Sequence, residues 1–255
     1  RFSAGQPEQG AHYAEALLQL LDVHDPATVA AVIVEPVTGS GGVYAPPLGY
    51  LQRLRELCDR HGVLLIFDEV ITGFGRVGES FAAQAFGVTP DLMTLAKGLT
   101  NGAVPMGGVL VSGAVYEAFM QGPASAIELM HGYTYSAHPL ACAAGLATLA
   151  VHEELGINAH VCTVAPLWQG TALALREQPW VQDVRAIGLL CAVELHSRDG
   201  APGARGAEVA RHCFDAGVLV RASGDTIVLS PPLVVSAEQI GLIFDTLRQA
   251  LERVA

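Results

Sequence analysis

The chain carries two kinds of hydrophobic pattern. Short runs rich in Val, Ile, Leu or Phe, bounded by Gly or Pro, are typical of strands buried on both faces of a parallel sheet. Between them, apolar residues spaced three and four apart predict amphipathic helices. Strands are predicted to begin at Val29, Val63, Leu92 and Met106, and helices to cover 9–23, 47–61, 80–86 and 139–153. This alternation indicates an α/β fold with a mostly parallel sheet.

The order of elements changes near residue 154. The pattern then predicts a helix over 158–177, a strand pair over 181–195 kinked at Gly188, a helix over 205–216, strands over 218–221 and 226–229, and a helix over 236–254. This is an α+β arrangement. We therefore predict a large domain over 1–153 and a small C-terminal α+β domain over 154–255.

Two charged residues stand at the ends of neighbouring predicted strands. Asp68 ends the run that begins at Val63, and Lys97 ends the run that begins at Leu92. A crossover connection brings the carboxyl ends of two parallel strands to one edge of the sheet, where open α/β folds bind ligands. Lys97 is the single lysine among 14 basic residues. A bias towards arginine could explain Lys97 alone, but Asp68 beside it favours a chemical role for the amine.

A lysine that forms a Schiff base, beside a carboxylate directed at a pyridinium nitrogen, is the protein's part of pyridoxal phosphate chemistry. The motifs DEVITGFGR (68–76), LAKG (95–98) and HGYTYSAHP (131–139) resemble the signature of class III aminotransferases, which are pyridoxal phosphate enzymes of fold type I. The resemblance covers essentially the whole chain. Within the class, the chain is most similar to ω-amino acid:pyruvate (β-alanine:pyruvate) aminotransferases. This implies transfer of an amino group from an ω-amino acid or amine to pyruvate or another 2-oxo acid.

The resemblance also implies roles for residues near the cofactor. Lys97 would hold the cofactor aldehyde and, once displaced by the amine substrate, would transfer a proton. Asp68 would keep the pyridine nitrogen protonated. Val70 would pack against one face of the ring, and Ile71 would line the substrate side. Ordinary core packing is the alternative for Val70 and Ile71, and both interpretations can hold together.

Three more positions are interpreted through the same resemblance. Thr134 would donate its hydroxyl to the cofactor phosphate of a neighbouring subunit, which implies a homodimer or a dimer of dimers. Arg221, ending the predicted strand 218–221, would bind a substrate carboxylate; a surface arginine is the alternative. Ser40 replaces a glutamate that enzymes acting on ornithine or 4-aminobutyrate carry there, which favours pyruvate as acceptor. The glycine-rich loop 39–42 around it is by itself typical of an ordinary connector.

Composition narrows the partners and the compartment. A net charge of −11 without basic clusters argues against nucleic acid, so the expected partners are small-molecule substrates. Apolar stretches fall short of the roughly 20 residues that span a bilayer, so we expect no membrane segment. The 5 cysteines are widely spaced and lack metal-ligand spacing. They indicate reduced thiols in a cytoplasmic protein, and we predict no metal site.

Two alternatives to transamination stay open, and the start of the sequence bears on one of them. The chain begins at Arg1 without a methionine. Complete class III enzymes have a further N-terminal portion that supplies a Gly/Ser turn for the cofactor phosphate and an aromatic residue stacked on the ring. We therefore expect that portion to be missing here. Another class III reaction, such as that of a decarboxylase, mutase or epimerase, and a non-catalytic remnant are the alternatives to transamination.

Overall fold

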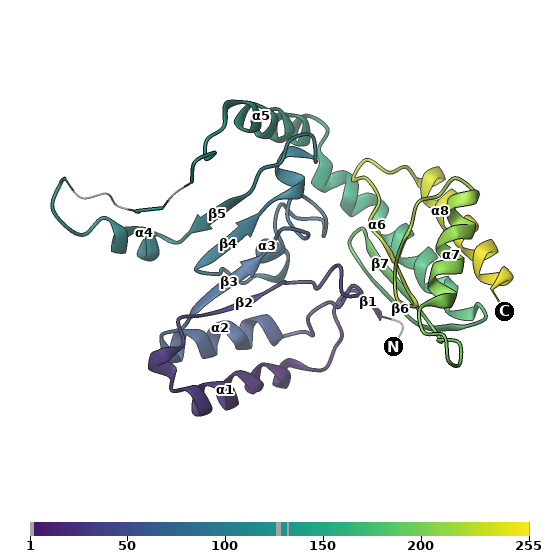
Figure 1. Cartoon of the computed structure of the whole chain (residues 1–255), viewed down its shortest axis with the longest axis horizontal. Helices are drawn as coiled ribbons and strands as arrows, with labels where there is room; N and C mark the ends of the chain where they lie inside the picture. The colour runs from purple at the N-terminus through teal and green to yellow at the C-terminus, as the bar shows by residue number, and fades with distance from the viewer. Residues whose placement is uncertain (1–2, 126–128, 132, 255) are drawn as a thin grey trace.

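The computed structural model describes residues 3–125, 129–131 and 133–254, and its strands form two sheets (Figure 1). The pairs β2–β3 and β3–β4 of the first sheet are parallel, whereas β5 runs antiparallel to β4. In sheet order its strands are β2 (Ala31–Val34), β3 (Leu64–Asp68), β4 (Leu92–Leu95) and β5 (Gly108–Val111). The predicted α/β architecture with a mostly parallel sheet is confirmed.

Helix α2 shows why the helices of the first part form where they do. Its apolar stripe, predicted from the spacing, is buried, and it ends at Gly62, whose φ of 67° suits glycine. The predicted helix over 9–23 is divided in two: a 3-10 turn, which follows Gly10 at a φ of 130°, ends at Glu15, and an α-helix begins at Ala16. The short helices and turns of this part are η1 (Ala11–Glu15), α1 (Ala16–His24), η2 (Pro26–Thr28), α2 (Tyr50–His61), α3 (Ala82–Phe86) and η3 (Lys97–Thr100).

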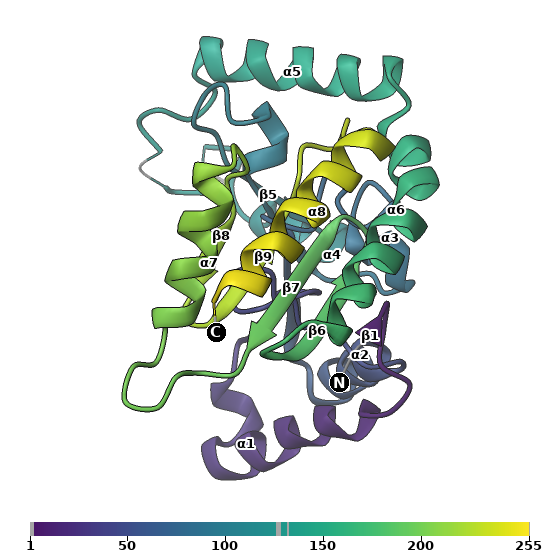
Figure 2. The same cartoon turned by 90° about the vertical axis from the view of Figure 1, so that its right-hand side faces the viewer.

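The second sheet is covered on one face by three helices (Figure 2). Trp168 and Phe244 meet edge-to-face in this core, with 4.8 Å between their ring centroids. In sheet order the strands are β1 (Ser3–Ala4), β6 (Val181–Ile187), β7 (Leu190–Leu195), β9 (Thr226–Leu229) and β8 (Arg221–Ser223). The helices are α6 (Ile157–Ala174), extended by η4 (Leu175–Glu177), α7 (Ala204–Asp215) and α8 (Ala237–Arg253).

Strand β8 differs from its prediction. The sequence predicts a strand over 218–221 that ends at Arg221, whereas Arg221 is the first residue of β8. The hairpin turn explains the shift. Gly224 has a φ of 59°, and the turn pairs Ser223 with Thr226, so the ladder to β9 starts at the turn and ends at Arg221.

The two parts of the chain are joined by a strand pairing and by a shared hydrophobic core. Strand β1 pairs in parallel with β6, and Gly5 N donates to the Ala186 carbonyl at 2.7 Å. The face of the second sheet that lies opposite its helices contributes Ile187, Leu190 and Ala192 to the core of the first part. The domain boundary between 153 and 154 stays a prediction.

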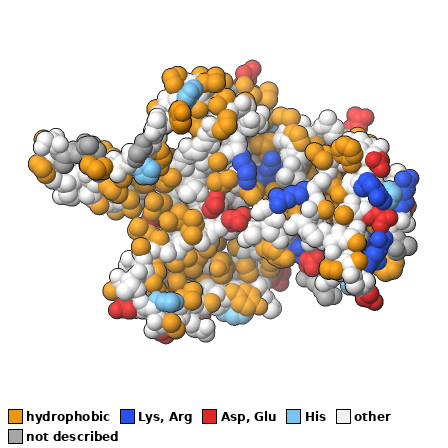
Figure 3. Space-filling view, in the orientation of Figure 1, with side chains coloured by type: hydrophobic (Ala, Val, Ile, Leu, Met, Phe, Trp, Pro, Cys, Tyr) orange, Lys and Arg blue, Asp and Glu red, His pale blue; other side chains and the backbone are white. Residues whose placement is uncertain are grey.

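The segment after β5, which includes α4 (Gly113–Phe119), extends away from the two sheets, and α5 (Pro139–Glu154) follows it (Figure 1). Apolar side chains gather on the surface of this segment (Figure 3). Leu110 of β5 is 52% exposed. Among the described residues no single helix is long and apolar enough to cross a membrane, and α5 with residues 157–177 passes that test only as a pair bent by 63°.

We expect the chain 1–255 on its own to form species larger than a dimer, because β5 presents an apolar strand with an unpaired edge. Leu110→Lys should shift the population towards smaller species in size-exclusion chromatography with light scattering. Leu242→Lys, at a position 61% exposed on α8, is the control and should change nothing. A monodisperse wild-type chain, or an equal effect of both variants, would contradict this expectation.

Candidate active site

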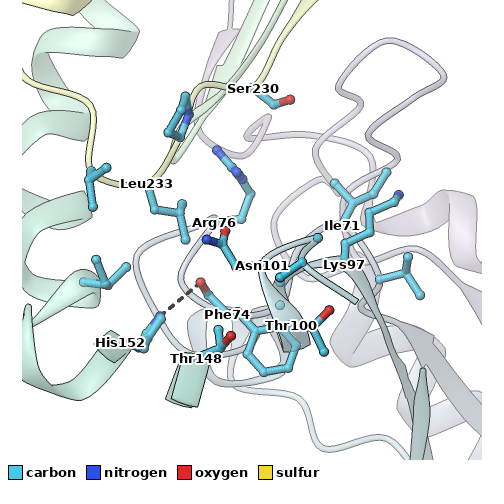
Figure 4. Close-up of a pocket in the computed structure, with 18 of the residues that line it drawn as sticks. Ile71, Phe74, Arg76, Lys97, Thr100, Asn101, Thr148, His152, Ser230 and Leu233 are labelled. Atoms are coloured by element: carbon cyan, nitrogen blue, oxygen red, sulfur yellow. Dashed lines mark hydrogen bonds between the residues drawn. The ribbon is translucent and has the colours of Figure 1, made fainter. Parts of the chain in front are cut away.

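A cavity of about 780 Å³ lies where the two parts of the chain meet (Figure 4). Four of the predicted site residues line it: Lys97, Val70, Ile71 and Arg221. Ser40 lines it as well, whereas Asp68 and Thr134 are not among the lining residues. In the view of Figure 4, Lys97 and Ile71 lie at one end of the cavity and His152 and Leu233 at the other.

Asp68 ends β3, and only one of its two carboxylate oxygens accepts hydrogen bonds from the described residues. Asp68 Oδ1 accepts hydrogen bonds from Val70 N and from Thr94 Oγ1, both at 3.1 Å. No described residue donates to Oδ2 in the structure. The carboxylate is therefore fixed in orientation by one oxygen, while the other is left to accept a bond from outside the protein.

Lys97 begins turn η3, two residues after β4 ends. Its φ of 45° is in the left-handed region, which a residue with a Cβ rarely adopts. The next residue must be glycine, because a Cβ at Gly98 would lie 2.8 Å from Phe74 Cβ. Phe74 in turn is held by His152, whose Nε2 donates to the Phe74 carbonyl at 3.1 Å (Figure 4). Close packing of two loops thus sets the direction of the Lys97 side chain.

The substrate side predicted for Ile71 is closed by the loop 39–42. A Cβ at Gly39 would lie 2.8 Å from Ile71 Cγ2, so the glycine lets this loop pack directly on Ile71. Arg185 of β6 holds the same loop from the second sheet, because its Nε donates to the Gly42 carbonyl at 2.8 Å. The guanidinium of Arg185 also lies 4.4 Å from the centroid of the Tyr44 ring.

Glu69 is a site residue that sequence reasoning missed. Its side chain is 0% exposed. The carboxylate accepts hydrogen bonds from Thr72 Oγ1 at 2.6 Å, from Ala82 N at 2.8 Å and from Ala83 N at 2.7 Å. It therefore caps α3, whose N-cap residue Phe81 has no side-chain oxygen. The position of Glu69 directly after Asp68 was the only signal, since the capped amides lie 13 and 14 residues away.

Arg76 was missed as well. Its Nη1 donates to the Pro231 carbonyl at 2.6 Å, and its own carbonyl accepts from Leu189 N at 3.0 Å. Gly188, at a φ of 53°, allows this approach, because a Cβ there would lie 2.6 Å from Val77 Cα. Burial lowers the pKa of the Arg76 guanidinium to about 10. The loop that starts at Asp68 thus ends on the second sheet.

Thr134 lies outside the cavity and is exposed. Its neighbourhood is a turn in which Ser136 N donates to the Tyr133 carbonyl at 3.0 Å. Gly132, the second residue of the motif 131–139, lies outside the described residues. The role of Thr134 therefore stays a prediction. No group of three His, Cys, Asp or Glu side chains in the described part of the chain could hold a metal ion, and the predicted lack of a metal is not tested by this.

Comparison with known proteins identifies the family. The family Aminotransferase class-III matches residues 3–251, and the chain belongs to it. An omega-aminotransferase of Caulobacter vibrioides is 55% identical over 98% of this chain and 57% of that protein. A beta-alanine–pyruvate aminotransferase of Pseudomonas aeruginosa is 46% identical over 100% of this chain and 57% of its own length. The chain therefore spans little more than half the length of these relatives.

Solved structures agree with the fold. An amine transaminase from an uncultivated Pseudomonas species, in its pyridoxal-phosphate-bound form, superposes with a TM-score of 0.89 at 40% identity, over 96% of this chain and 57% of that one. A thermostable omega-transaminase from Thermomicrobium roseum gives 0.89 at 36% identity, over 96% of this chain and 55% of that one. The expected fold of type I is confirmed, and pyridoxal phosphate is the cofactor of the family.

The residues of this chain fit that cofactor. Asp68 Oδ2, a carboxylate oxygen to which none of the described residues donates, and the cavity-lining amine of Lys97 stand at the tips of paired strands β3 and β4. These are the two groups that a pyridine nitrogen and an aldehyde require. Val70 lines the same cavity and supplies an apolar surface for a ring.

We expect Glu69→Ala to lower the free energy of unfolding by about 3 kcal/mol, because three buried donors lose their acceptor. Urea unfolding followed by circular dichroism measures the change. The matched control is Glu79→Ala, an exposed carboxylate a short distance along the same loop. If both variants unfold at the wild-type urea concentration, Glu69 does not hold this loop.

Proposed function

We propose that the protein containing this chain is a pyridoxal-phosphate-dependent aminotransferase that moves an amino group from an ω-amino acid or amine to pyruvate or another 2-oxo acid. The observation that supports it most is the placement of Lys97 and Arg221 in one cavity, on different sheets, with Asp68 at the strand tip beside Lys97. A reactive amine and a carboxylate-binding cation that line the same cavity can then act on one substrate.

Each residue near the cofactor has a proposed task. Bound pyridoxal phosphate supplies an aldehyde that takes up the amino group and a ring that withdraws electrons from the adjacent carbon. Lys97 Nζ would hold the cofactor aldehyde and, when free, would carry a proton between the substrate carbon and the adjoining cofactor carbon. Asp68 Oδ2 holds the proton on the pyridine nitrogen. Val70 packs on the ring and excludes water from one face.

The substrate side rests on Arg221, Ile71 and Ser40. Arg221 reaches the cavity from β8 and is exposed there, so its fork of donors is available for a carboxylate. Ile71 and the loop packed on it limit the space next to Lys97. Ser40 lines the cavity and carries no charge that would pair with Arg221, so both a carboxylate acceptor and a carboxylate-free amine can be accommodated.

The proposed assembly is a homodimer or a dimer of dimers in the cytoplasm. Thr134 lies outside this chain's own cavity, which is compatible with a role in the partner's phosphate site. Helix α5 exposes Leu140, Leu146 and Leu149, apolar side chains that a second subunit would cover. All 5 cysteines are free, as a reducing compartment requires. The large and small domains would then be 1–153 and 154–255.

Borohydride reduction of the protein with pyridoxal phosphate should leave a single modified peptide, the one containing Lys97, because the chain has no other lysine. Peptide mass spectrometry identifies the site. Lys97→Arg should abolish the label, since a guanidinium does not form the imine. A label confined to the N-terminal amine would contradict the assignment.

Arg221→Ala should raise KM for pyruvate roughly tenfold to a hundredfold, because a charge-assisted contact to the carboxylate is lost. The KM of a carboxylate-free amine donor should change far less. Arg253→Ala, on the exposed last turn of α8, is the control. Alanine formed from pyruvate is the measured product. Carbon dioxide release in place of alanine would point to a decarboxylase, and equal losses for both substrates would remove Arg221 from its role.

A further inference from the structure

Thr94 lies beside Asp68 because of the parallel pairing of β3 and β4. Asp68 and Thr94 are Cα partners in this ladder. The backbone of Glu69, the residue after Asp68, fixes the spacing of Asp68 and Thr94, since Glu69 N donates to the Thr94 carbonyl at 3.0 Å. Residues paired in register on neighbouring strands project to the same face, so the two side chains must meet.

The contact between the two side chains has a defined direction. Thr94 Oγ1 lies 3.1 Å from Asp68 Oδ1. An ionised carboxylate can only accept, so the hydroxyl donates. Because threonine is branched at Cβ, few side-chain rotamers compete with the one that makes this bond. No other acceptor for the Thr94 hydroxyl is present in the described part of the structure.

Two hydrogen-bond donors to Asp68 Oδ1 fix the orientation of the carboxylate better than one donor would. Val70 N alone would leave the carboxylate free to turn about its Cβ–Cγ bond, because a single bond to Oδ1 can be kept over a range of angles. The Thr94 hydroxyl reaches Oδ1 from the neighbouring strand, whereas Val70 N reaches it from Asp68's own loop. The carboxylate plane is then fixed, and with it the direction of Oδ2.

We propose that Thr94 is a positioning residue that, together with Val70 N, directs Asp68 Oδ2 at the pyridine nitrogen of the cofactor. This inference rests on the proposed function, since it assumes that Asp68 meets the ring. It assigns a task to a residue outside the three motifs that carry the family resemblance.

Three variants and a control test this inference. Thr94→Val keeps the shape and removes the hydroxyl, Thr94→Ser keeps the hydroxyl, and Asp68→Asn is the reference for loss of the carboxylate. Thr226→Val, at another strand threonine whose hydroxyl makes no hydrogen bond in the described structure, is the matched control. The readouts are the cofactor Kd from absorbance titration, the pH profile of the visible band of the bound cofactor, kcat, and the urea midpoint of the cofactor-free protein.

Thr94→Val should weaken cofactor binding and lower kcat, each roughly tenfold, and should shift the pH profile of the visible band in the same direction as Asp68→Asn. Thr94→Ser should stay within about twofold of wild type, and Thr226→Val should be unchanged. The urea midpoint should not account for the loss, because the hydroxyl acts on the carboxylate and not on the strand pairing. If Thr94→Val does not fold, Thr94→Ala carries the same expectations.

The outcomes separate this inference from the function on which it rests. Wild-type behaviour of Thr94→Val alongside an impaired Asp68→Asn would overturn the role of Thr94 and leave the proposed function standing. A lower urea midpoint with an unshifted pH profile would show a merely structural role and would also overturn it. Normal cofactor binding and turnover in Asp68→Asn would instead remove the proposed function itself.

Discussion

The buried carboxylate of Glu69 is the interaction on which the site depends. It satisfies the first two amides of α3 and the hydroxyl of Thr72, all in a place that water does not reach. A buried carboxylate is tolerated only when its hydrogen bonds are complete. The observed conformation of the loop completes the hydrogen bonds of Glu69, and few other conformations of the loop would do so. Asp68 is the preceding residue, and its backbone direction is therefore set by its neighbour.

The other end of the same loop, at Arg76, is attached to the part of the cavity wall that the second sheet provides. Arg76 donates hydrogen bonds to the Pro231 and Leu189 carbonyls. The segment around Pro231 lines the cavity near the strand pair β8–β9, which bears Arg221. One loop thus carries the carboxylate at its start and anchors the substrate-side sheet at its end. Arg185 adds a second attachment through the Gly42 carbonyl, so the wall around Ser40 is held by the second sheet as well as by its packing on Ile71.

Most of the strands, the main helices and the position of Asp68 and Lys97 at the ends of neighbouring strands were predictable, because buried runs, helical spacing and the residues at strand ends are local properties of the sequence. Glu69 and Arg76 were not, because their partners are distant: Arg76 binds carbonyls 113 and 155 residues further on. The position of β8 was misjudged for a related reason, since the turn at Gly224, and not the apolar run 218–220, sets where pairing with β9 occurs. Nothing in the sequence indicated a role for Thr94, since only the register of the strand pairing places it beside Asp68.

The left-handed backbone at Lys97 follows from the same packing. Phe74 also has a positive φ, of 59°, and its side chain fills the space that a Cβ at Gly98 would need. Phe74 and Lys97, both with left-handed backbone, therefore belong to two loops that pack on each other where Phe74 meets Gly98, and a strained backbone persists only where its surroundings leave no alternative. One of these loops bears Asp68 and the other bears Lys97. Their mutual packing fixes the amine relative to the carboxylate without any ligand, so a cofactor would enter a site whose two reactive ends are already in place.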